Sequence, residues 1–186
     1  MCGRYYISIE ESELREILKE VQSKADAAVR TGEIFPTNIV PVIPAGGVPQ
    51  AMKWGFLKFD GKGHIINARS ESAAEKSMFR KPLHEGRCLI PASNYFEWMT
   101  VDGKKQKYAI SSGSTPLYMA GLYRYEKGND FPAMVILTRD AAPDIAFIHD
   151  RMPVIIPIEQ QLSWLDGGLS LSDIPAPAHM QYKIAL

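Results

Sequence analysis

The sequence predicts an α+β fold dominated by antiparallel sheet, and three observations support this class. One amphipathic helical pattern stands near the N-terminus, and from about residue 33 the chain changes to short β-like runs broken by Pro and Gly. No repeat, low-complexity tract or linker divides the 186 residues, which are enough for one hydrophobic core. We therefore expect a single domain over residues 1–186.

The first elements follow from the N-terminal 22 residues. The run "CGRYYIS" predicts a strand that places Cys2 at the edge of the core. Ser8 and Glu11 then have the spacing of a capping box, which predicts that the helix begins there. The apolar face of this helix is formed by Leu14, Ile17, Leu18 and Val21.

Strands are expected along most of the remaining chain. The run "NIVPVIPAGGVPQ" predicts an edge strand and a turn, because its prolines would disrupt a central strand. Asp102 and Gly103 predict a hairpin turn between two strands. Short helices are expected in "PDIAFIHD" and "PIEQQLSWL". The runs with strand length and β-rich composition are "AMKWGFLKF", "RCLIPA", "YFEWMT", "QKYAIS", "LYMAGLYRY" and "AMVILT".

Composition and charge exclude several classes of protein. Apolar residues make up 46% and charged residues 23%, as in ordinary globular proteins. The formal net charge is zero, so a polyanion would have to bind a local cluster of Arg and Lys. The sequence contains neither a long apolar run nor a secretory signal. Cys2 and Cys88 form no disulfide framework, which favours the cytoplasm.

Cys2 is the first candidate for chemistry. Aminopeptidases usually remove an initiator Met before a small residue, which would leave Cys2 with a free α-amine beside its thiol. An α-amine titrates at about 7.7–8.0, so it can attack an aldehyde near neutral pH and form a Schiff base. The thiol then closes a five-membered thiazolidine ring, or acts alone as a nucleophile if its pKa is lowered. A buried structural cysteine is the alternative.

Other polar residues could act with Cys2. Alternation in "INARSE" puts Asn67, Arg69 and Glu71 on one face of a strand, although a polar strand end would look the same. Glu97 lies between two aromatic residues and either faces solvent or lies in a cleft, where desolvation would raise its pKa.

The segment "AFIHDRMPVI" contains His149 and Arg151, and His149 is either a hydrogen-bonded structural residue or a catalyst. None of the four histidines has a convincing metal spacing, so no metal is expected. Asn94 is expected at a turn position with positive φ. P-loop, G-x-S-x-G and dinucleotide motifs are absent from the sequence.

Eight motifs together carry a family resemblance. They are "MCGRY" at the start, "PTN" at 36–38, "KWGF" at 53–56, "NARSE" at 67–71, "RCLIPASNYFEW" at 87–98, "AGLY" at 120–123, "LTRDA" at 137–141 and "IHDRMPVI" around residue 149. In this order the chain resembles the SRAP (SOS response-associated peptidase) family of abasic-site-processing proteins. The resemblance implies a partly barrel-like sheet with peripheral helices.

The resemblance also implies a function in DNA damage repair and the SOS response. The mature N-terminal Cys2 would form a covalent thiazolidine crosslink with the ring-opened aldehyde of an abasic site in single-stranded DNA. Asn67 would orient Cys2 or the sugar, Glu97 would transfer protons, and His149 would assist ring opening and crosslink reversal. Lyase-type strand incision and autocatalytic peptidase-type removal of Met1 are also expected. No cofactor is implied, and a cytoplasmic monomer that joins the nucleoid on damaged DNA is expected.

The expected DNA-binding surface combines cations with aromatic rings. Arginines would pair with phosphates and the rings would stack on bases, although core packing is the alternative for each ring. Some loop positions rest on the resemblance alone. The expected DNA contacts are Arg4, Pro36, Asn38, Trp54, Phe56, Arg69, Trp98, Thr138 and Arg151.

Two other functions stay open. A cysteine peptidase could use the α-amine of Cys2 as the base for its own thiol, as N-terminal nucleophile enzymes do. It would also need an oxyanion hole, which cannot be identified in the sequence. A non-enzymatic binding module would retain Cys2 as a structural residue and leave Asn67, Glu97 and His149 without a role.

Overall fold

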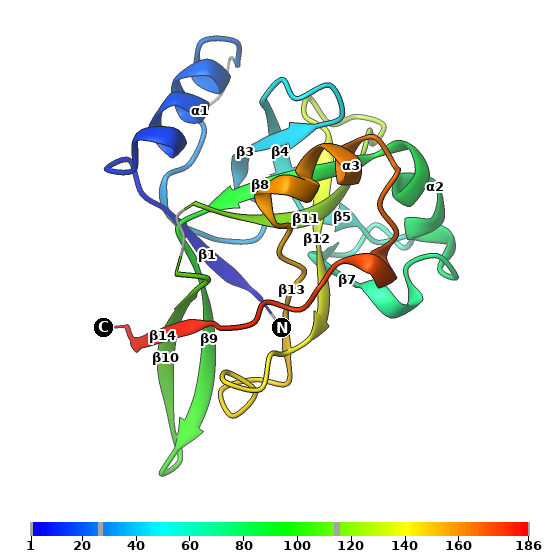
Figure 1. Cartoon of the computed structure of the whole chain (residues 1–186). Coiled ribbons are helices and arrows are strands. Elements are labelled where there is room, and N and C mark those ends of the chain that lie inside the picture. The colour runs from blue at the N-terminus through cyan, green and yellow to red at the C-terminus, as the bar shows by residue number, and fades with distance from the viewer. Residues whose placement is uncertain (1, 26–27, 114–115, 186) are drawn as a thin grey trace.

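The computed structural model describes residues 2–25, 28–113 and 116–185 (Figure 1). Within them the helices are α1 (Ser12–Gln22), α2 (Ser77–Glu85) and α3 (Gln161–Leu165), with 3-10 turns η1 (Ser70–Ser72), η2 (Ile158–Gln160) and η3 (Leu171–Asp173). The strands are β1 (Arg4–Ile7), β2 (Gly32–Ile34), β3 (Ile39–Pro44), β4 (Gln50–Trp54), β5 (Phe56–Leu57), β6 (His64–Ile65), β7 (Asn67–Arg69), β8 (Arg87–Ala92), β9 (Asn94–Val101), β10 (Lys104–Ser111), β11 (Leu117–Arg124), β12 (Ala133–Asp140), β13 (Arg151–Pro153) and β14 (Gln181–Ile184).

Five strands close into a small barrel. Their order is β11, β8, β3, β4 and β12, and β12 pairs with β11 again to complete the circle. The pairs are antiparallel except β4 with β12, which run parallel. Strand β12 also pairs with β7 and β13, so it connects the barrel to two segments that the sequence analysis singled out. The predicted α+β class with a partly barrel-like sheet is confirmed.

A second, antiparallel sheet has the strand order β14, β10, β9, β1 and β2. Its β9–β10 hairpin extends away from the barrel (Figure 1). The turn residues Asp102 and Gly103 have φ values of 49° and 75°. Two consecutive positive φ angles define the type I′ turn that matches the twist of a hairpin, so the predicted turn is confirmed.

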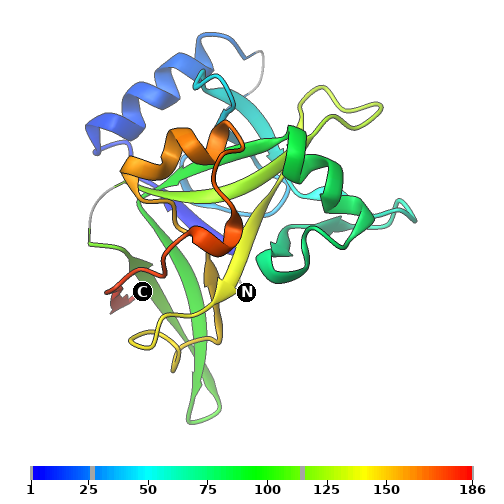
Figure 2. The ribbon, with the colours of Figure 1, turned by 45° about the vertical axis from the view of Figure 1, so that its right-hand side comes forward.

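The helices cover different parts of the barrel. Helix α1 buries Leu14, Leu18 and Val21, as its apolar spacing predicted, and packs on β3 and β4. Each such side chain stabilises the fold by about 1.5–3 kcal/mol when fully buried. Helix α2 and the β5–β6 hairpin lie together on another side (Figure 2). Gly55, with φ of 122°, separates β4 from β5, which the sequence predicted as one strand.

Two predictions about helices are wrong. The residue that precedes α1 is Glu11, and Ser8 instead accepts a hydrogen bond from the backbone N–H of Glu10 at 3.2 Å. The segment 143–150 forms consecutive turns, closed by hydrogen bonds such as Ile148 N–H to the carbonyl of Ile145 at 2.9 Å. This bond runs from an N–H to the carbonyl three residues earlier, as that from Ile145 N–H to Ala142 also does, whereas an α-helix repeats bonds to the fourth preceding residue.

Two predictions about strands and turns are also wrong. Strand β3 is not at an edge, because β4 pairs with its first part and β8 with its last part. Each proline of β3 therefore faces a partner strand on one side only. The hydrogen bond that a proline cannot donate is not required at these positions. Asn94 begins β9 without a positive φ, whereas Thr37 has a φ of 72°. The expected helix at 157–165 is present as η2 followed by α3.

Candidate active site

Cys2 lies two residues before the start of β1 and is fully buried. Its Sγ lies 3.6 Å from the backbone oxygen of Arg4, as a weak S–H···O hydrogen bond. Desolvation by burial raises the pKa of the Cys2 thiol well above its usual range, and the nearby Glu97 carboxylate raises it further. The thiol of Cys2 is therefore protonated at neutral pH in this environment.

Asn67 connects β7 to Cys2. Its Nδ2 donates a hydrogen bond of 2.9 Å to the carbonyl oxygen of Cys2. Strand β7 holds this amide in place because Asn67 is paired with Ile136 of the barrel strand β12. The Oδ1 atom of Asn67 is buried and has no hydrogen-bond partner among the described residues, so it is an acceptor available to a group placed beside residue 2.

Glu97 and His149 complete the cluster. Glu97 is 3% exposed, and desolvation raises the pKa of its carboxyl to about 7. The Nε2 of His149 lies 3.9 Å from Oε2 of Glu97. Burial also lowers the pKa of His149, since it disfavours the charged imidazolium. Glu97 can therefore gain or lose a proton near neutral pH, which suits general acid–base catalysis, while burial favours the neutral ring of His149.

The other ring nitrogen of His149 fixes its orientation. Nδ1 accepts a hydrogen bond of 3.0 Å from the backbone N–H of Arg151 and lies 2.8 Å from Oδ1 of Asp150. A neutral ring that accepts at Nδ1 carries its proton on Nε2, which faces Glu97. A protonated ring can instead pair Nδ1–H with Asp150.

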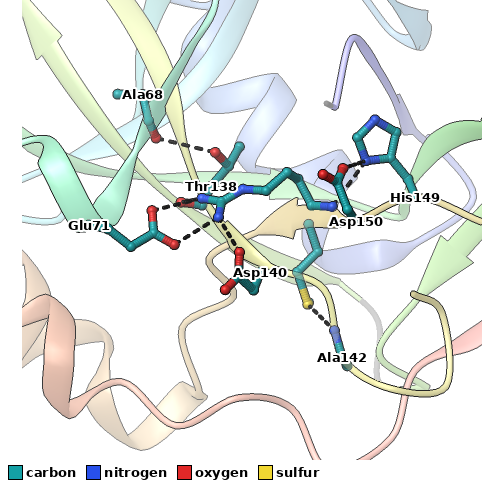
Figure 3. Close-up of polar contacts among 9 residues, drawn as sticks. Ala68, Glu71, Thr138, Asp140, Ala142, His149 and Asp150 are labelled. Carbon is teal, nitrogen blue, oxygen red and sulfur yellow. Dashed lines mark hydrogen bonds and ion pairs between the residues drawn. The ribbon is translucent and has the colours of Figure 1, made fainter. Parts of the chain in front are cut away.

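An ion-pair network around the buried Arg151 lies next to His149, and its carboxylates, Glu71 and Asp140, are exposed (Figure 3). Both terminal nitrogens of Arg151 bind the Glu71 carboxylate at 2.8 Å, and Nη1 also lies 2.5 Å from Asp140. Nη2 donates a further bond of 2.8 Å to the carbonyl of Thr138. The guanidinium lowers the pKa of Glu71 through these hydrogen bonds. Arg151 is thus held on the barrel while its backbone N–H holds His149.

The network changes what can be expected of the "NARSE" segment. Asn67 and Arg69 both lie on β7, but their side chains differ in exposure. Asn67 is half-buried beside Cys2, whereas Arg69 is exposed to solvent. Glu71 has left the strand and lies in η1, so the predicted common face does not extend to it. A phosphate contact by Arg151 stays a prediction, and it would have to compete with Glu71 and Asp140.

Three expected DNA contacts are corrected by their burial. Trp54 and Phe56 are fully buried, and Trp54 donates its Nε1–H to the carbonyl of Ile66 at 3.0 Å. Thr138 is fully buried inside β12. No surface of these side chains is open to a base or a phosphate, so their expected roles in DNA binding are not available in this structure. The rings of Trp54 and Phe56 pack in the core, which is the alternative role expected for them.

Other expected contacts remain at the surface. Trp98 follows Glu97 in β9, so its ring points to the opposite face of the sheet, where the guanidinium of Arg4 lies 5.5 Å from the ring centre. Arg4 also lies over Phe35 at 4.0 Å. Pro36 and Asn38 are half-buried in the turn after β2, and roles for all these residues in DNA binding stay predictions.

Sequence reasoning missed one cation, Lys107, and one carboxylate, Glu33, near these rings. Lys107 lies 3.9 Å from the ring centre of Phe96, and Glu33 binds both Lys107 and Arg4, at 2.8 Å and 3.0 Å. The hairpin turn could have revealed Lys107, because the register of a two-residue turn places it opposite Trp98. The Glu71–Arg151 pair had no such signal, since 80 residues separate its members.

Two features are absent from the part of the chain that the structure describes. No group of three or more His, Cys, Asp or Glu side chains in this part of the chain could hold a metal ion. Nor is any helix there long and apolar enough to cross a membrane.

A buried thiol beside a carboxyl and an imidazole with shifted pKa values is typical of the candidate catalytic sites of enzymes. A sequence profile of the family described as SOS response associated peptidase (SRAP) matches residues 1–182. The chain therefore belongs to the SRAP family.

Curated relatives share one description. The chain is 35% identical over 185 residues to the abasic site processing protein YoqW of Bacillus subtilis, covering 89% of this chain and 80% of the relative. The abasic site processing protein YedK of Escherichia coli is 33% identical over 121 residues, covering 63% of this chain and 54% of the relative. The protein HMCES of Gallus gallus, with the same description, is 28% identical over 173 residues, covering 80% and 49%.

Solved structures support the fold. A protein from Bacteroides thetaiotaomicron matches with a TM-score of 0.83 at 23% identity, covering 98% of this chain and 91% of that one. A protein from Bordetella bronchiseptica matches with a TM-score of 0.79 at 23% identity over the full length of both chains.

Proposed function

We propose that this protein processes abasic sites by capturing them covalently in single-stranded DNA. The observation that carries the proposal is the convergence of Cys2, Asn67, Glu97 and His149, which come from four distant parts of the sequence. The curated relatives are described as abasic site processing proteins, and this supports DNA with abasic sites as the substrate. The strand type, the crosslink and action as a monomer belong to the proposal.

The reaction begins after cleavage of the bond between Met1 and Cys2. The free α-amine of Cys2 attacks the aldehyde carbon C1′ of the ring-opened sugar, and loss of water gives an imine. The thiol sulfur then adds to the imine carbon, while the S–H proton moves to the imine nitrogen. The product is a thiazolidine ring that joins residue 2 to the DNA. Elimination of the 3′ phosphate from the imine would instead cut the strand, which accounts for a lyase-type side reaction.

Each neighbour of Cys2 has a role in these steps. Asn67 holds the carbonyl of Cys2, and its open Oδ1 would accept a hydrogen bond from the new α-amine. Glu97, with a pKa of about 7, would take the thiol proton and deliver it to nitrogen. His149, with its Nε2 proton directed toward Glu97, would act on the sugar oxygen during ring opening and crosslink reversal.

The raised pKa of the Cys2 thiol disfavours the peptidase alternative. A cysteine peptidase needs a thiolate, which requires a lowered pKa, whereas burial and Glu97 raise it here. Attack by the amine needs no thiolate. Burying the carboxyl group of Glu97 costs free energy. In a non-enzymatic binding module this buried carboxyl would have no function to offset that cost.

Intact-protein mass spectrometry tests the proposal. The purified chain is mixed with a single-stranded oligonucleotide that carries one natural abasic site. We expect the mass of Met1 to be absent beforehand, and the adduct to have the combined mass of protein and DNA less one water. Processed protein that forms no adduct would overturn the proposal.

The second cysteine provides the matched control. Cys2→Ala keeps the α-amine but lacks the thiol that closes the ring, so it should form no stable adduct, whereas Cys88→Ala, which removes the other buried thiol, should still form it. Cleavage of peptide substrates by the Cys88→Ala variant but not by Cys2→Ala, without any DNA adduct, would favour the peptidase.

A further inference from the structure

A cavity lies beside the candidate active site and is not explained by the reaction itself. It has a volume of about 640 Å³ and lies between the β5–β6 hairpin, β7 and the start of α2. Asn67, whose side chain donates a hydrogen bond to the carbonyl of Cys2, forms part of its wall, so the cavity adjoins the site at this residue. We call it the hairpin cavity. Its apolar wall consists of Ile65, Ala68, Met78 and Phe79.

Phe59 stands at the rim of the hairpin cavity with 80% of its surface exposed. It lies in the turn that joins β5 to β6, between Lys58 and Asp60. A phenyl ring so exposed contributes little to the core, and its exposure to water is unfavourable. A ring beside a channel of cations is the usual platform on which proteins stack single-stranded bases.

The rim of the hairpin cavity is positively charged although the whole chain is neutral. Lys58, Arg69 and Lys76 line it, and Asp60 is the acidic side chain in the same lining. A local excess of cations beside an apolar wall is complementary to a nucleotide, which has an anionic phosphate and a flat apolar base. The volume lies within the range of about 300–1,000 Å³ that small-ligand sites occupy.

We propose that the hairpin cavity binds the nucleotide adjacent to the abasic one. Its base stacks on Phe59 against the apolar wall, and its phosphate lies among the three cations. This inference rests on the proposed function, since it needs DNA at Cys2. The hairpin cavity thus recognises the undamaged nucleotide next to the abasic site. Binding of this nucleotide places the aldehyde at Cys2.

The test uses a strand that carries a tetrahydrofuran abasic analogue, which has no aldehyde and cannot be crosslinked. 2-Aminopurine is placed directly 5′ or directly 3′ of the analogue, and its fluorescence falls when it stacks. We expect quenching at one of the two positions with the wild-type protein. Phe59→Ala should abolish this quenching and weaken the affinity by about five- to one-hundred-fold.

A matched exposed aromatic residue serves as the control. Tyr125 is 77% exposed and lies outside the lining of the cavity, so Tyr125→Ala should keep both quenching and affinity. The double variant Lys58→Ala, Lys76→Ala should reduce the steepness of log affinity against log salt by about 1.4, because two phosphate contacts on single-stranded DNA are lost. Quenching at neither position, or unchanged quenching in Phe59→Ala, would overturn the proposal.

The outcome is independent of covalent capture. If the wild-type protein forms a crosslink with natural abasic DNA but the quenching does not depend on Phe59, the hairpin cavity proposal fails and the proposed function stands. If no crosslink forms but Phe59-dependent quenching is found, the proposed function fails and the cavity remains a nucleotide-binding site.

Discussion

Glu97 is the residue whose burial should make stability depend on pH. Its pKa of about 7 exceeds the ordinary 4.5, so between these values the folded protein binds a proton that the unfolded chain has lost. The free energy of unfolding therefore falls as pH rises through this window, by about 3 kcal/mol at most.

The Glu97→Gln variant cannot ionise, so its stability should not change with pH in this way. Urea unfolding of both proteins at pH 5, 6, 7 and 8 measures the difference. We expect the stability of the variant relative to wild type to increase with pH. Parallel curves would show that Glu97 is not desolvated.

Asn67 provides a second test at the scale of a residue. Asn67→Ala removes the hydrogen bond to the carbonyl of Cys2, worth about 1 kcal/mol, and should slow adduct formation by about fivefold. The rate is measured by quenched-flow gel analysis at saturating DNA. Asn129→Ala removes a surface hydrogen bond to Glu126 and should leave the rate unchanged. Equal rates in the two variants would contradict a positioning role for Asn67.

At the scale of elements, the ion pairs between η1, β12 and β13 should control His149. Glu71→Gln removes the charge that holds Arg151, which loosens the backbone N–H bonded to Nδ1 of His149. That bond stabilises the neutral ring, so its loss should raise the pKa of His149 toward the ordinary value. NMR titration of the ring protons measures this pKa.

Glu75→Gln is the matched control for this prediction. Glu75 is an exposed glutamate four residues further along, and its replacement should leave the pKa of His149 unchanged. A pKa that is the same in Glu71→Gln and in wild type would show that the network does not position the ring.

Elements with local signals were predictable from the sequence. The periodicity of α1, the β9–β10 hairpin and the β-rich runs all depend on residues close together in the chain. The turns of segment 143–150 were not predictable, since two aromatic rings from distant elements pack on its Phe147: the ring centre of Phe147 lies 5.1 Å from that of Tyr182 and 6.4 Å from that of Tyr108. The short strands β2, β7 and β14 have little local signal, because they pair with strands far away in sequence.

The same reasoning explains the site. Cys2, Asn67, Glu97 and His149 were chosen for their chemistry and their motifs, and the structure brings them together. Exposure could not be predicted as well, because an aromatic residue in a strand has the same sequence pattern whether it faces solvent or the core. Trp54 and Phe56 are buried while Trp98 is partly exposed, and only the closed barrel decides this.

At the scale of the whole molecule, closure of the barrel allows one prediction. A Cβ atom on Gly121 would lie 2.6 Å from Ile90 Cδ1, 2.8 Å from Cys88 Sγ and 3.1 Å from the carbonyl of Val135. These atoms belong to β8 and β12, which flank β11. Gly121→Ala should therefore force the strands apart and destabilise the fold by about 3 kcal/mol.

Thermal unfolding followed by circular dichroism measures this effect, and a decrease in Tm of about 5–10 °C is expected. In the control variant Gly168→Ala, the nearest neighbour of the new Cβ lies at 3.7 Å, so Tm should change little. An unchanged Tm in Gly121→Ala would mean that the barrel can widen there without loss of packing.

The pairing of β1 with β9 has a consequence for biosynthesis. Arg4 pairs with Phe96, so the strand that covers the N-terminal segment is translated about 90 residues later. At about 5–20 residues per second, ribosomes need on the order of 5 to 20 s to make that stretch. During this interval the start of the chain is unfolded outside the exit tunnel. A methionine aminopeptidase can therefore act on it before the cysteine becomes enclosed, and the timing of translation would determine whether the nucleophile matures.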